Sequence, residues 1–112
     1  MSELIREIRR SPEGTVVEAH GEIDLRHQPE FQKALTAVCA EKPAVLVIHL
    51  AEVDYMDSSG VGTLVKISHT VKGYGGKLVL AAPKPRVMSI FEITALDKYF
   101  TIVADEQEAL GS

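Results

Sequence analysis

The stretch "AVLVIHLAEVDYMDSSGVGTLVKISHTV" runs from Ala44 to Val71 and joins two different hydrophobic patterns. Its opening "AVLVIHL" is aliphatic apart from one histidine, which predicts a strand buried on both faces. From Val61 onward, apolar residues recur at every third or fourth position, which predicts an amphipathic helix. Between the two patterns stands "DSSG", Asp57 to Gly60. A buried strand followed by a helix is the repeating unit of α/β domains, so this stretch predicts that class.

The flanking sequence repeats this unit in both directions. Two short alternating stretches near the start are joined by "SPEG", Ser11 to Gly14, whose proline and glycine favour a tight hairpin. The pattern predicts a mixed, mostly parallel sheet of about five strands with about four helices and an N-terminal β-hairpin. Strands are expected at residues 4–9, 15–20, 44–50, 77–82 and 99–103, and helices at 29–42, 61–71, 85–94 and 105–110.

Length and composition limit the class of protein. The 112 residues suffice for one compact domain and are too few for two, so a single domain is expected over residues 1–112. The net charge of −4 and the scattered basic residues argue against direct binding of nucleic acid, which needs a concentrated basic face. No apolar run reaches signal-peptide or membrane-spanning length, so a cytoplasmic protein without a membrane partner is expected. Cys39 falls on the apolar stripe of a predicted helix and is expected to be buried.

Two polar stretches follow predicted strands, namely "GEID", Gly21 to Asp24, and "DSSG". In an open parallel sheet, functional groups gather beyond the carboxyl ends of the strands. We therefore expect both stretches at one edge of the domain, with Asp24 within reach of Ser58. Asp and Ser are also preferred helix caps, so one polar residue here is explained by capping alone. Three in a row exceed what a cap needs, which leaves a functional role open beside the structural one.

Catalytic and metal-binding alternatives fit these residues less well. Neither "SGVGT" nor "GYGGKL" supplies the Lys-Ser or Lys-Thr pair of a nucleotide-binding loop. A serine hydrolase of the sharp-turn type places its nucleophile within G-x-S-x-G, which this sequence lacks. The four histidines are not spaced as a metal set, and His49 and His69 lie in a predicted strand and a predicted helix. Binding is therefore favoured over catalysis, with no metal and no cofactor expected.

Several landmarks together resemble the bacterial anti-sigma factor antagonists, which are single-domain members of the STAS fold. They follow one another in the family's order over nearly the whole chain: "GEID", "AVLVIHL", "VDYMDSSGVG" and "GYGGKLVLAAPKPRVMSIFEIT". The most specific is the Asp-Ser-Ser-Gly-aliphatic-Gly run, preceded by an aromatic residue and Met56. Two positions depart from the family pattern, because Val61 replaces a more common Leu and Ala95 stands where many relatives have Gly. The resemblance implies a STAS-type fold.

The resemblance also implies a site and its partners. In that family, the hydroxyl directly after the motif Asp is phosphorylated by a partner that is both an anti-sigma factor and a GHKL-type serine kinase. A PP2C-type phosphatase removes the phosphate. By position, Ser58 is then the phosphoacceptor, with Asp24, Asp57, Ser59 and Gly60 in support and with Gly60 allowing close approach of the partner. The residues expected to contact the partner are Glu22, Asp24, Met56, Ser58, Ser59 and Val61.

Partner switching is the function that this resemblance implies. The unphosphorylated protein would bind the kinase and free a sigma factor, and phosphorylation of Ser58 would abolish that binding. ATP would belong to the kinase, so the protein itself would be no enzyme. The same likeness also fits a STAS subunit of a stress-sensing, lipid-transport or other partner-switching complex without a sigma factor, and this alternative stays open.

Overall fold

Strands and helices alternate along most of the chain. The computed structural model describes residues 3–111. In chain order the elements are β1 (Ile5–Ser11), β2 (Gly14–Ile23), α1 (Gln28–Cys39), β3 (Val45–Met56), α2 (Ser58–Gly73), β4 (Lys77–Ala81), α3 (Pro85–Ile93), β5 (Thr101–Val103) and α4 (Glu106–Leu110). The predicted element types are confirmed throughout this part of the chain.

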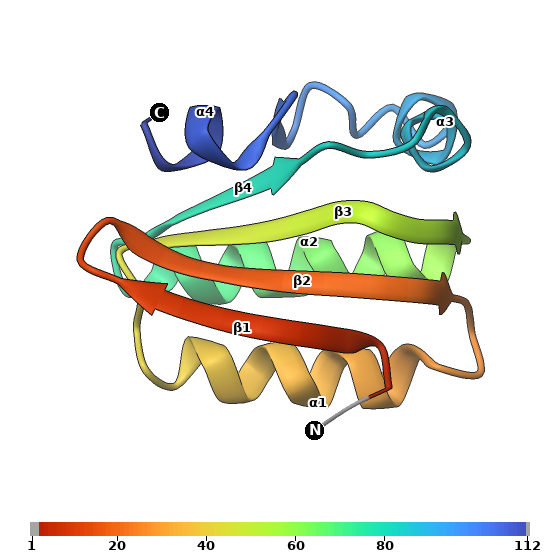
Figure 1. Ribbon diagram of the computed structural model, residues 1–112. Helices are drawn as coiled ribbons and strands as arrows, with labels where there is room; N and C mark the ends of the chain where they lie inside the picture. Colours follow the sequence, from red (N-terminus) through yellow and green to blue (C-terminus); the bar gives the residue numbers. More distant parts are fainter. Residues whose placement is uncertain (1–2, 112) are drawn as a thin grey trace.

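The strands form one mixed sheet in the order β1-β2-β3-β4-β5 (Figure 1). β1 and β2 make the antiparallel N-terminal hairpin, and the other three pairs are parallel. This arrangement confirms the predicted mixed, mostly parallel sheet, and β3 lies at its centre. The first part of β3 is its most apolar part, since Leu46, Val47 and Ile48 are all buried.

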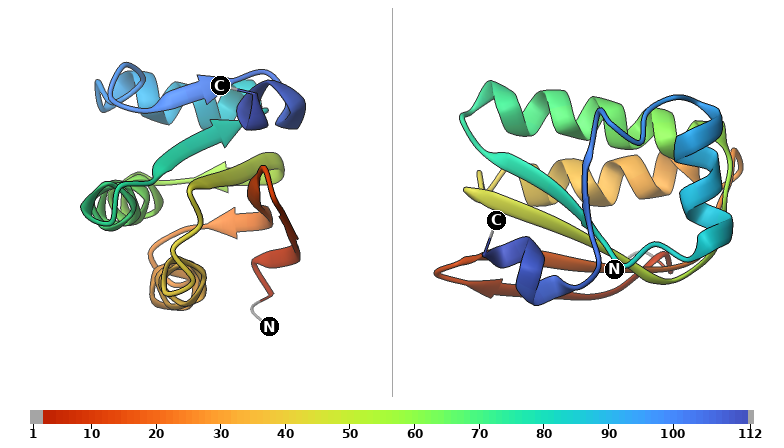
Figure 2. Two further views of the ribbon diagram at one scale, coloured as in Figure 1. Left: turned by 90° about the vertical axis from the view of Figure 1, so that its left-hand side faces the viewer. Right: turned by 90° about the horizontal axis from the view of Figure 1, so that it is seen from above.

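Helices cover the two faces of the sheet unequally. α1 and α2 lie side by side on one face, and the short α4 lies on the opposite face (Figure 2). The larger core fills the space between the sheet and α1, α2 and α3, with Phe31, Leu64 and Phe91 fully buried in it. A smaller core on the other face places Ala109 of α4 against Val47. Cys39 is buried in the larger core, as predicted.

The two strands that carry the polar stretches are longer than predicted. β2 continues to Ile23 and β3 to Met56, whereas the sequence pattern predicted ends at His20 and Leu50. Two register shifts in the β2–β3 pairing interrupt the simple alternation of side chains that a sequence pattern relies on. Because the pairing resumes after each shift, both strands reach the same edge of the sheet.

Helix α1 is shorter than predicted. It ends at Cys39, not at Lys42, because Lys42 adopts a left-handed φ of 52° and the following Pro43 cannot continue a helix. Its start is favoured by Pro29 in the first turn. Among the helices within residues 3–111, none combines the length and the hydropathy needed to cross a membrane.

Candidate functional site

The carboxyl ends of β2 and β3 bring the two polar stretches together. Glu22 pairs with Tyr55 and Ile23 with Met56 in the parallel ladder. Beyond the ladder, the Asp57 N–H donates a hydrogen bond of 3.3 Å to the Ile23 carbonyl oxygen. The prediction that "GEID" and "DSSG" are neighbours at one edge of the sheet is therefore confirmed.

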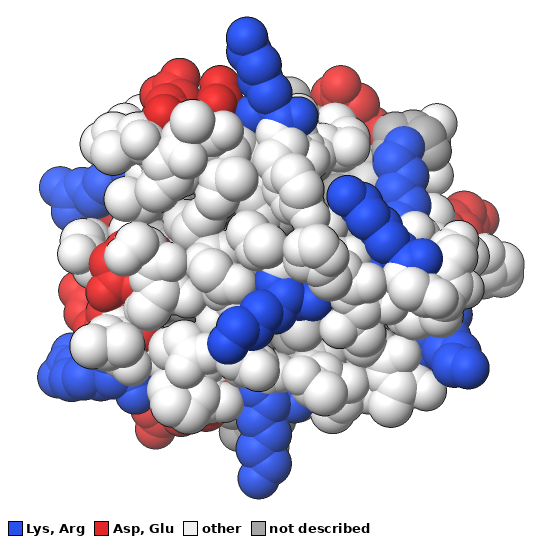
Figure 3. Space-filling model, turned by 180° about the vertical axis from the view of Figure 1, so that it is seen from behind, with Lys and Arg blue, Asp and Glu red and all other residues white. Residues whose placement is uncertain are grey.

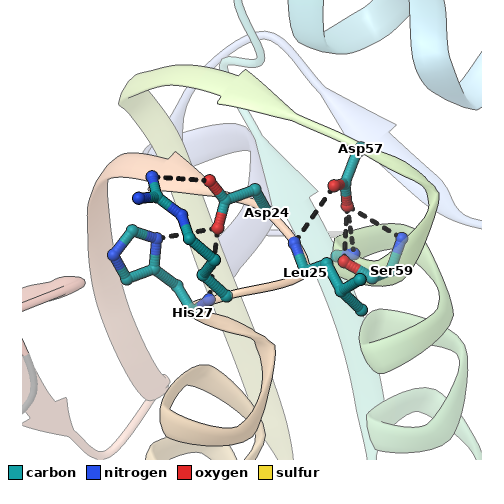
Figure 4. A network of polar contacts seen from close by, with 7 residues as sticks. Asp24, Leu25, His27, Asp57 and Ser59 are labelled. Carbon is teal, nitrogen blue, oxygen red and sulfur yellow. Dashed lines mark hydrogen bonds and ion pairs between the residues drawn. The ribbon is translucent and has the colours of Figure 1, made fainter.

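Asp57 connects the loop after β2 to the first turn of α2 (Figure 4). Its Oδ1 accepts hydrogen bonds from the Ser59 N–H at 2.9 Å, from the Ser59 hydroxyl and from the Gly60 N–H at 3.4 Å. Its Oδ2 accepts the Leu25 N–H at 3.1 Å. Partial desolvation acts to raise the pKa of Asp57, but these four hydrogen bonds outweigh it and hold the pKa below its usual value. Asp57 is thus a charged N-cap.

The two serines after Asp57 occupy different environments. Ser59 is half-buried, and both its hydroxyl and its N–H donate to Asp57, so this side chain is committed to the cap. Ser58 is the first residue of α2 and is exposed, and its hydroxyl has no hydrogen-bond partner within residues 3–111. Of the two hydroxyl groups, Ser58 presents the one that a partner can reach without breaking the cap.

Asp24 lies at the same edge, but its carboxylate points toward the start of α1 (Figure 4). Its Oδ1 accepts the His27 N–H at 3.2 Å and lies 2.9 Å from His27 Nδ1, while Oδ2 accepts from Arg26 at 3.2 Å. Desolvation acts to raise the pKa of Asp24, but the bonds from His27 and Arg26 outweigh it and lower the pKa. Asp24 is therefore a second ionised carboxylate at this edge, paired with Arg26 and not bonded to Ser58.

Three residues of the predicted site have internal roles. A Cβ atom at Gly60 would lie 2.7 Å from Met56 Cγ and 2.9 Å from the Ile23 carbonyl oxygen, so packing against β2 and β3 requires this glycine. Met56 and Val61 are 3% and 1% exposed and belong to the larger core. Met56 and Val61 were expected to contact a partner, but in this conformation they have almost no exposed surface, so that contact stays a prediction.

Two exposed apolar residues at this edge were missed from the sequence. Leu25 is 72% exposed although its N–H is fixed on Asp57, and Tyr55 is 42% exposed where it pairs with Glu22. Exposed apolar side chains that gather on one surface are typical of contact surfaces. The signal in the sequence was a leucine inside an otherwise polar loop, but a loop leucine is equally compatible with burial.

The geometry gives no sign of hydrolytic or metal chemistry. Ser58 has no base bonded to its hydroxyl within residues 3–111. In the same part of the chain, no three His, Cys, Asp or Glu side chains gather in a metal-binding group. At this edge an exposed hydroxyl lies beside two ionised carboxylates and the exposed Leu25.

Comparison with known proteins identifies the fold and its relatives. The STAS domain matches residues 6–109. The anti-sigma-B factor antagonist of Listeria monocytogenes is 36% identical over 92 residues, which cover 82% of this chain and 81% of that protein. The crystal structure of an anti-sigma factor antagonist from Mycobacterium paratuberculosis is 28% identical, with a TM-score of 0.85 over 94% of this chain and 89% of that one. Phosphorylated SpoIIAA from Bacillus is 21% identical, with a TM-score of 0.68 over 96% and 95%.

The chain therefore belongs to the STAS domain family. Both the relative from Listeria and the solved structure from Mycobacterium are named anti-sigma factor antagonists. In this fold, Asp24, Leu25, Asp57 and Ser58 lie together beyond the carboxyl ends of β2 and β3.

Proposed function

We propose that this protein is an anti-sigma factor antagonist that acts in the cytoplasm by partner switching. In its unphosphorylated form it binds an anti-sigma factor that is also a GHKL-type serine kinase, and a sigma factor is released. Phosphorylation of Ser58 ends that binding. The observation that carries the proposal is that the two serine hydroxyls differ in their bonding. The Ser59 hydroxyl donates to Asp57, whereas the Ser58 hydroxyl is exposed and has no hydrogen-bond partner within residues 3–111. The names of the relatives support the sigma-factor pathway.

The surface that we expect to contact the kinase consists of the residues that are exposed at this edge of the sheet. Glu22, Leu25, Tyr55 and Ser58 are exposed, and Asp24 and Ser59 are half-buried between them. Leu25 is the apolar anchor of this surface, because its backbone is fixed by Asp57 while its side chain remains in water. Met56 and Val61 support the surface from beneath without reaching it.

A phosphate on Ser58 would change the charge of this surface with little effect on the fold. It adds about −1.5 to −2 charges at pH 7. The N-terminus of α2 tolerates that charge, but Asp57 already occupies the N–H groups of Ser59 and Gly60. Covering an unpaired dianion beside Asp57 and Asp24 costs on the order of 3 kcal/mol, which corresponds to about a hundredfold loss of affinity.

In this scheme the protein is a substrate and a ligand, not an enzyme. The kinase binds ATP and transfers its γ-phosphoryl group to the Ser58 oxygen, and the hydroxyl proton leaves to a base or to solvent. A PP2C-type phosphatase restores the hydroxyl by hydrolysis of the phosphate ester. The protein needs no metal and no cofactor of its own for either state.

The decisive experiment recovers the partner and locates the phosphate. The tagged chain is purified from its native cells, and the proteins bound to it are identified by mass spectrometry. The recovered kinase is then purified and incubated with ATP and with wild type, Ser58→Ala or Ser59→Ala. We expect a GHKL-type serine kinase, stoichiometric phosphorylation of wild type and Ser59→Ala, and none of Ser58→Ala.

Three results would contradict the proposal. Full phosphorylation of Ser58→Ala would move the phosphoacceptor elsewhere. A stable complex without any kinase would favour a subunit of a stress-sensing or lipid-transport assembly. Turnover of an ester or nucleotide by the purified chain alone, lost in Ser58→Ala, would indicate an enzyme.

A further inference from the structure

The two glycines at the start of α2 serve different purposes. Gly60 is required by internal packing, since a Cβ atom there would meet Met56 and Ile23. Gly62 is exposed, and a Cβ atom there would have no neighbour within 4 Å. Gly62 also lies inside a regular helix and is not among the residues with positive φ. The fold therefore gains nothing from the absence of a side chain at Gly62.

The absence of a side chain at Gly62 also has a cost. Glycine is the least favourable residue in a helix apart from proline, because it loses the most backbone freedom on folding. Gly73 is equally open, but it is the last residue of α2, where the low helix propensity of glycine costs less than it does inside a helix. Gly62 has no such explanation, because it lies within the second turn.

The position of Gly62 relates it to the proposed phosphorylation site. Residues four apart in a helix lie on one face, so Ser58, Gly62 and Lys66 follow one another along α2. All three are exposed. At Gly62, one turn beyond Ser58, the helix backbone is therefore not covered by a side chain. Glycine is the residue that lets another molecule approach the backbone closely.

The same helix face has a definite charge. Between Ser58 and Gly73, α2 contains Lys66 and Lys72 but no Asp or Glu. The Lys66 side chain has no ion-pair partner within residues 3–111. Figure 3, which views the molecule from the helix side, shows basic side chains across the middle of this face and acidic ones at its margins. On a protein of net charge −4, this face is suited to an acidic surface.

We propose that Gly62 is a specificity-determining contact of the kinase, which seats its main chain directly over Gly62 and places a carboxylate against Lys66. This inference rests on the proposed function and deepens it. In this inference, the glycine that allows close approach of the partner is Gly62, and not Gly60. A phosphate on Ser58 would then repel an acidic partner surface one turn away, in addition to the cost of covering it.

The test uses the full chain and the kinase recovered as described above, loaded with a non-hydrolysable ATP analogue so that no phosphate is transferred. Affinities are compared for wild type, Gly62→Ala, Gly62→Gln and the matched control Gly73→Gln. Unfolding temperatures are measured in parallel. We expect Gly62→Ala to unfold at a higher temperature than wild type and yet to bind more weakly. Gly62→Gln should bind at least about tenfold more weakly, and Gly73→Gln within about twofold of wild type.

The charge contact is tested with Lys66→Glu and the control Lys77→Glu, which lies at the start of β4. Lys66→Glu should weaken binding by about tenfold and reduce its dependence on salt, whereas Lys77→Glu should do neither. Wild-type affinity in Gly62→Gln would overturn the assignment of Gly62, and wild-type affinity in Lys66→Glu would overturn the acidic contact. If the wild-type chain binds no kinase at all, the proposed function fails and this inference fails with it.

Discussion

The Leu25 N–H donates a hydrogen bond of 3.1 Å to Asp57 Oδ2 across the edge of the sheet. The other oxygen of the same carboxylate caps α2. One side chain therefore fixes both the loop that carries the exposed leucine and the helix that carries Ser58. The apolar and the polar parts of the proposed contact surface form a single unit for this reason.

Replacing Asp57 with Ala should destabilise the protein and loosen this edge. It removes the cap of α2 and the acceptor of the Leu25 N–H, so we expect a loss of about 1 to 2 kcal/mol in the free energy of unfolding. Urea denaturation measures this loss. Asp105→Ala is the matched control, since Asp105 also caps a helix, but α4 is short and peripheral. A larger loss in the control than in Asp57→Ala would contradict the central role of Asp57.

The stability of the protein should fall in acid because of this carboxylate. The pKa of Asp57 is lower in the folded protein than in the unfolded chain, where it is about 3.9. Its contribution is therefore present above the unfolded pKa and is lost as the pH falls through the folded pKa. Unfolding free energies measured between pH 7 and pH 3 should decline from about pH 5 downward, and Asp57→Asn should reduce that slope. An equal slope in the variant would show that other carboxylates carry the whole effect.

A negative charge at Ser58 should weaken kinase binding without unfolding the domain. Ser58→Asp supplies about half of the charge of a phosphate, so we expect a loss of affinity of about tenfold with an unchanged unfolding temperature. Ser58→Ala should bind within about threefold of wild type, because the hydroxyl makes no bond that the fold needs. Calorimetric titration with the kinase measures both. Equal affinities of Ser58→Asp and Ser58→Ala would contradict an electrostatic switch.

Ala95 is a strained position that a glycine should relieve. It adopts a left-handed φ of 60° just after α3. Non-glycine residues pay about 1 kcal/mol or more for this conformation, so Ala95→Gly should stabilise the protein by about 1 kcal/mol. The control is Ala40→Gly, because Ala40 has a φ of −61° at the end of α1 and the change there should destabilise. Thermal and urea unfolding should move in opposite directions for the two variants.

Arg9 should hold α4 against the sheet without contributing much to overall stability. Its guanidinium bonds both oxygens of Glu106, at 2.6 and 2.7 Å, and one oxygen of Glu18 at 3.0 Å. Because Arg9 is 40% exposed, Arg9→Met should cost less than about 1 kcal/mol overall. Amide hydrogen exchange in α4 should nevertheless become about tenfold faster. Arg10→Met, which breaks only the exposed pair with Glu41, should leave α4 exchange unchanged.

The sequence pattern predicted which elements form, but not where two of the strands end. Hydrophobic patterns, together with turn and capping residues, located every helix and strand within residues 3–111, because each element buries at least one face. The pattern did not predict the last residues of β2 and β3. These residues are strand because pairing between β2 and β3 continues after two register shifts. Such pairing is a tertiary effect that no local pattern contains.

The place of the candidate site in the fold was predicted from the sequence, but the environment of each side chain was not. Neighbouring strand ends placed Asp24 and Asp57 at one edge, and the resemblance to a known family pointed to Ser58. Sequence could not distinguish Ser58 from Ser59 physically, because either can cap a helix. It also could not show that Met56 and Gly60 face inward, since that depends on the packing of β2 and β3 against α2.

The hydrogen bonds that Asp57 accepts at the start of α2 affect how long a phosphate on Ser58 would persist. Since this carboxylate already holds the N–H groups of Ser59 and Gly60, these two donors of the first turn of α2 are not free to bind a phosphate on Ser58. Such a group would stand in water, open to a phosphatase at every encounter. On the proposed function, the relative abundance of the kinase and the phosphatase then sets the lifetime of the phosphorylated state. The fold of the protein itself does not prolong that state.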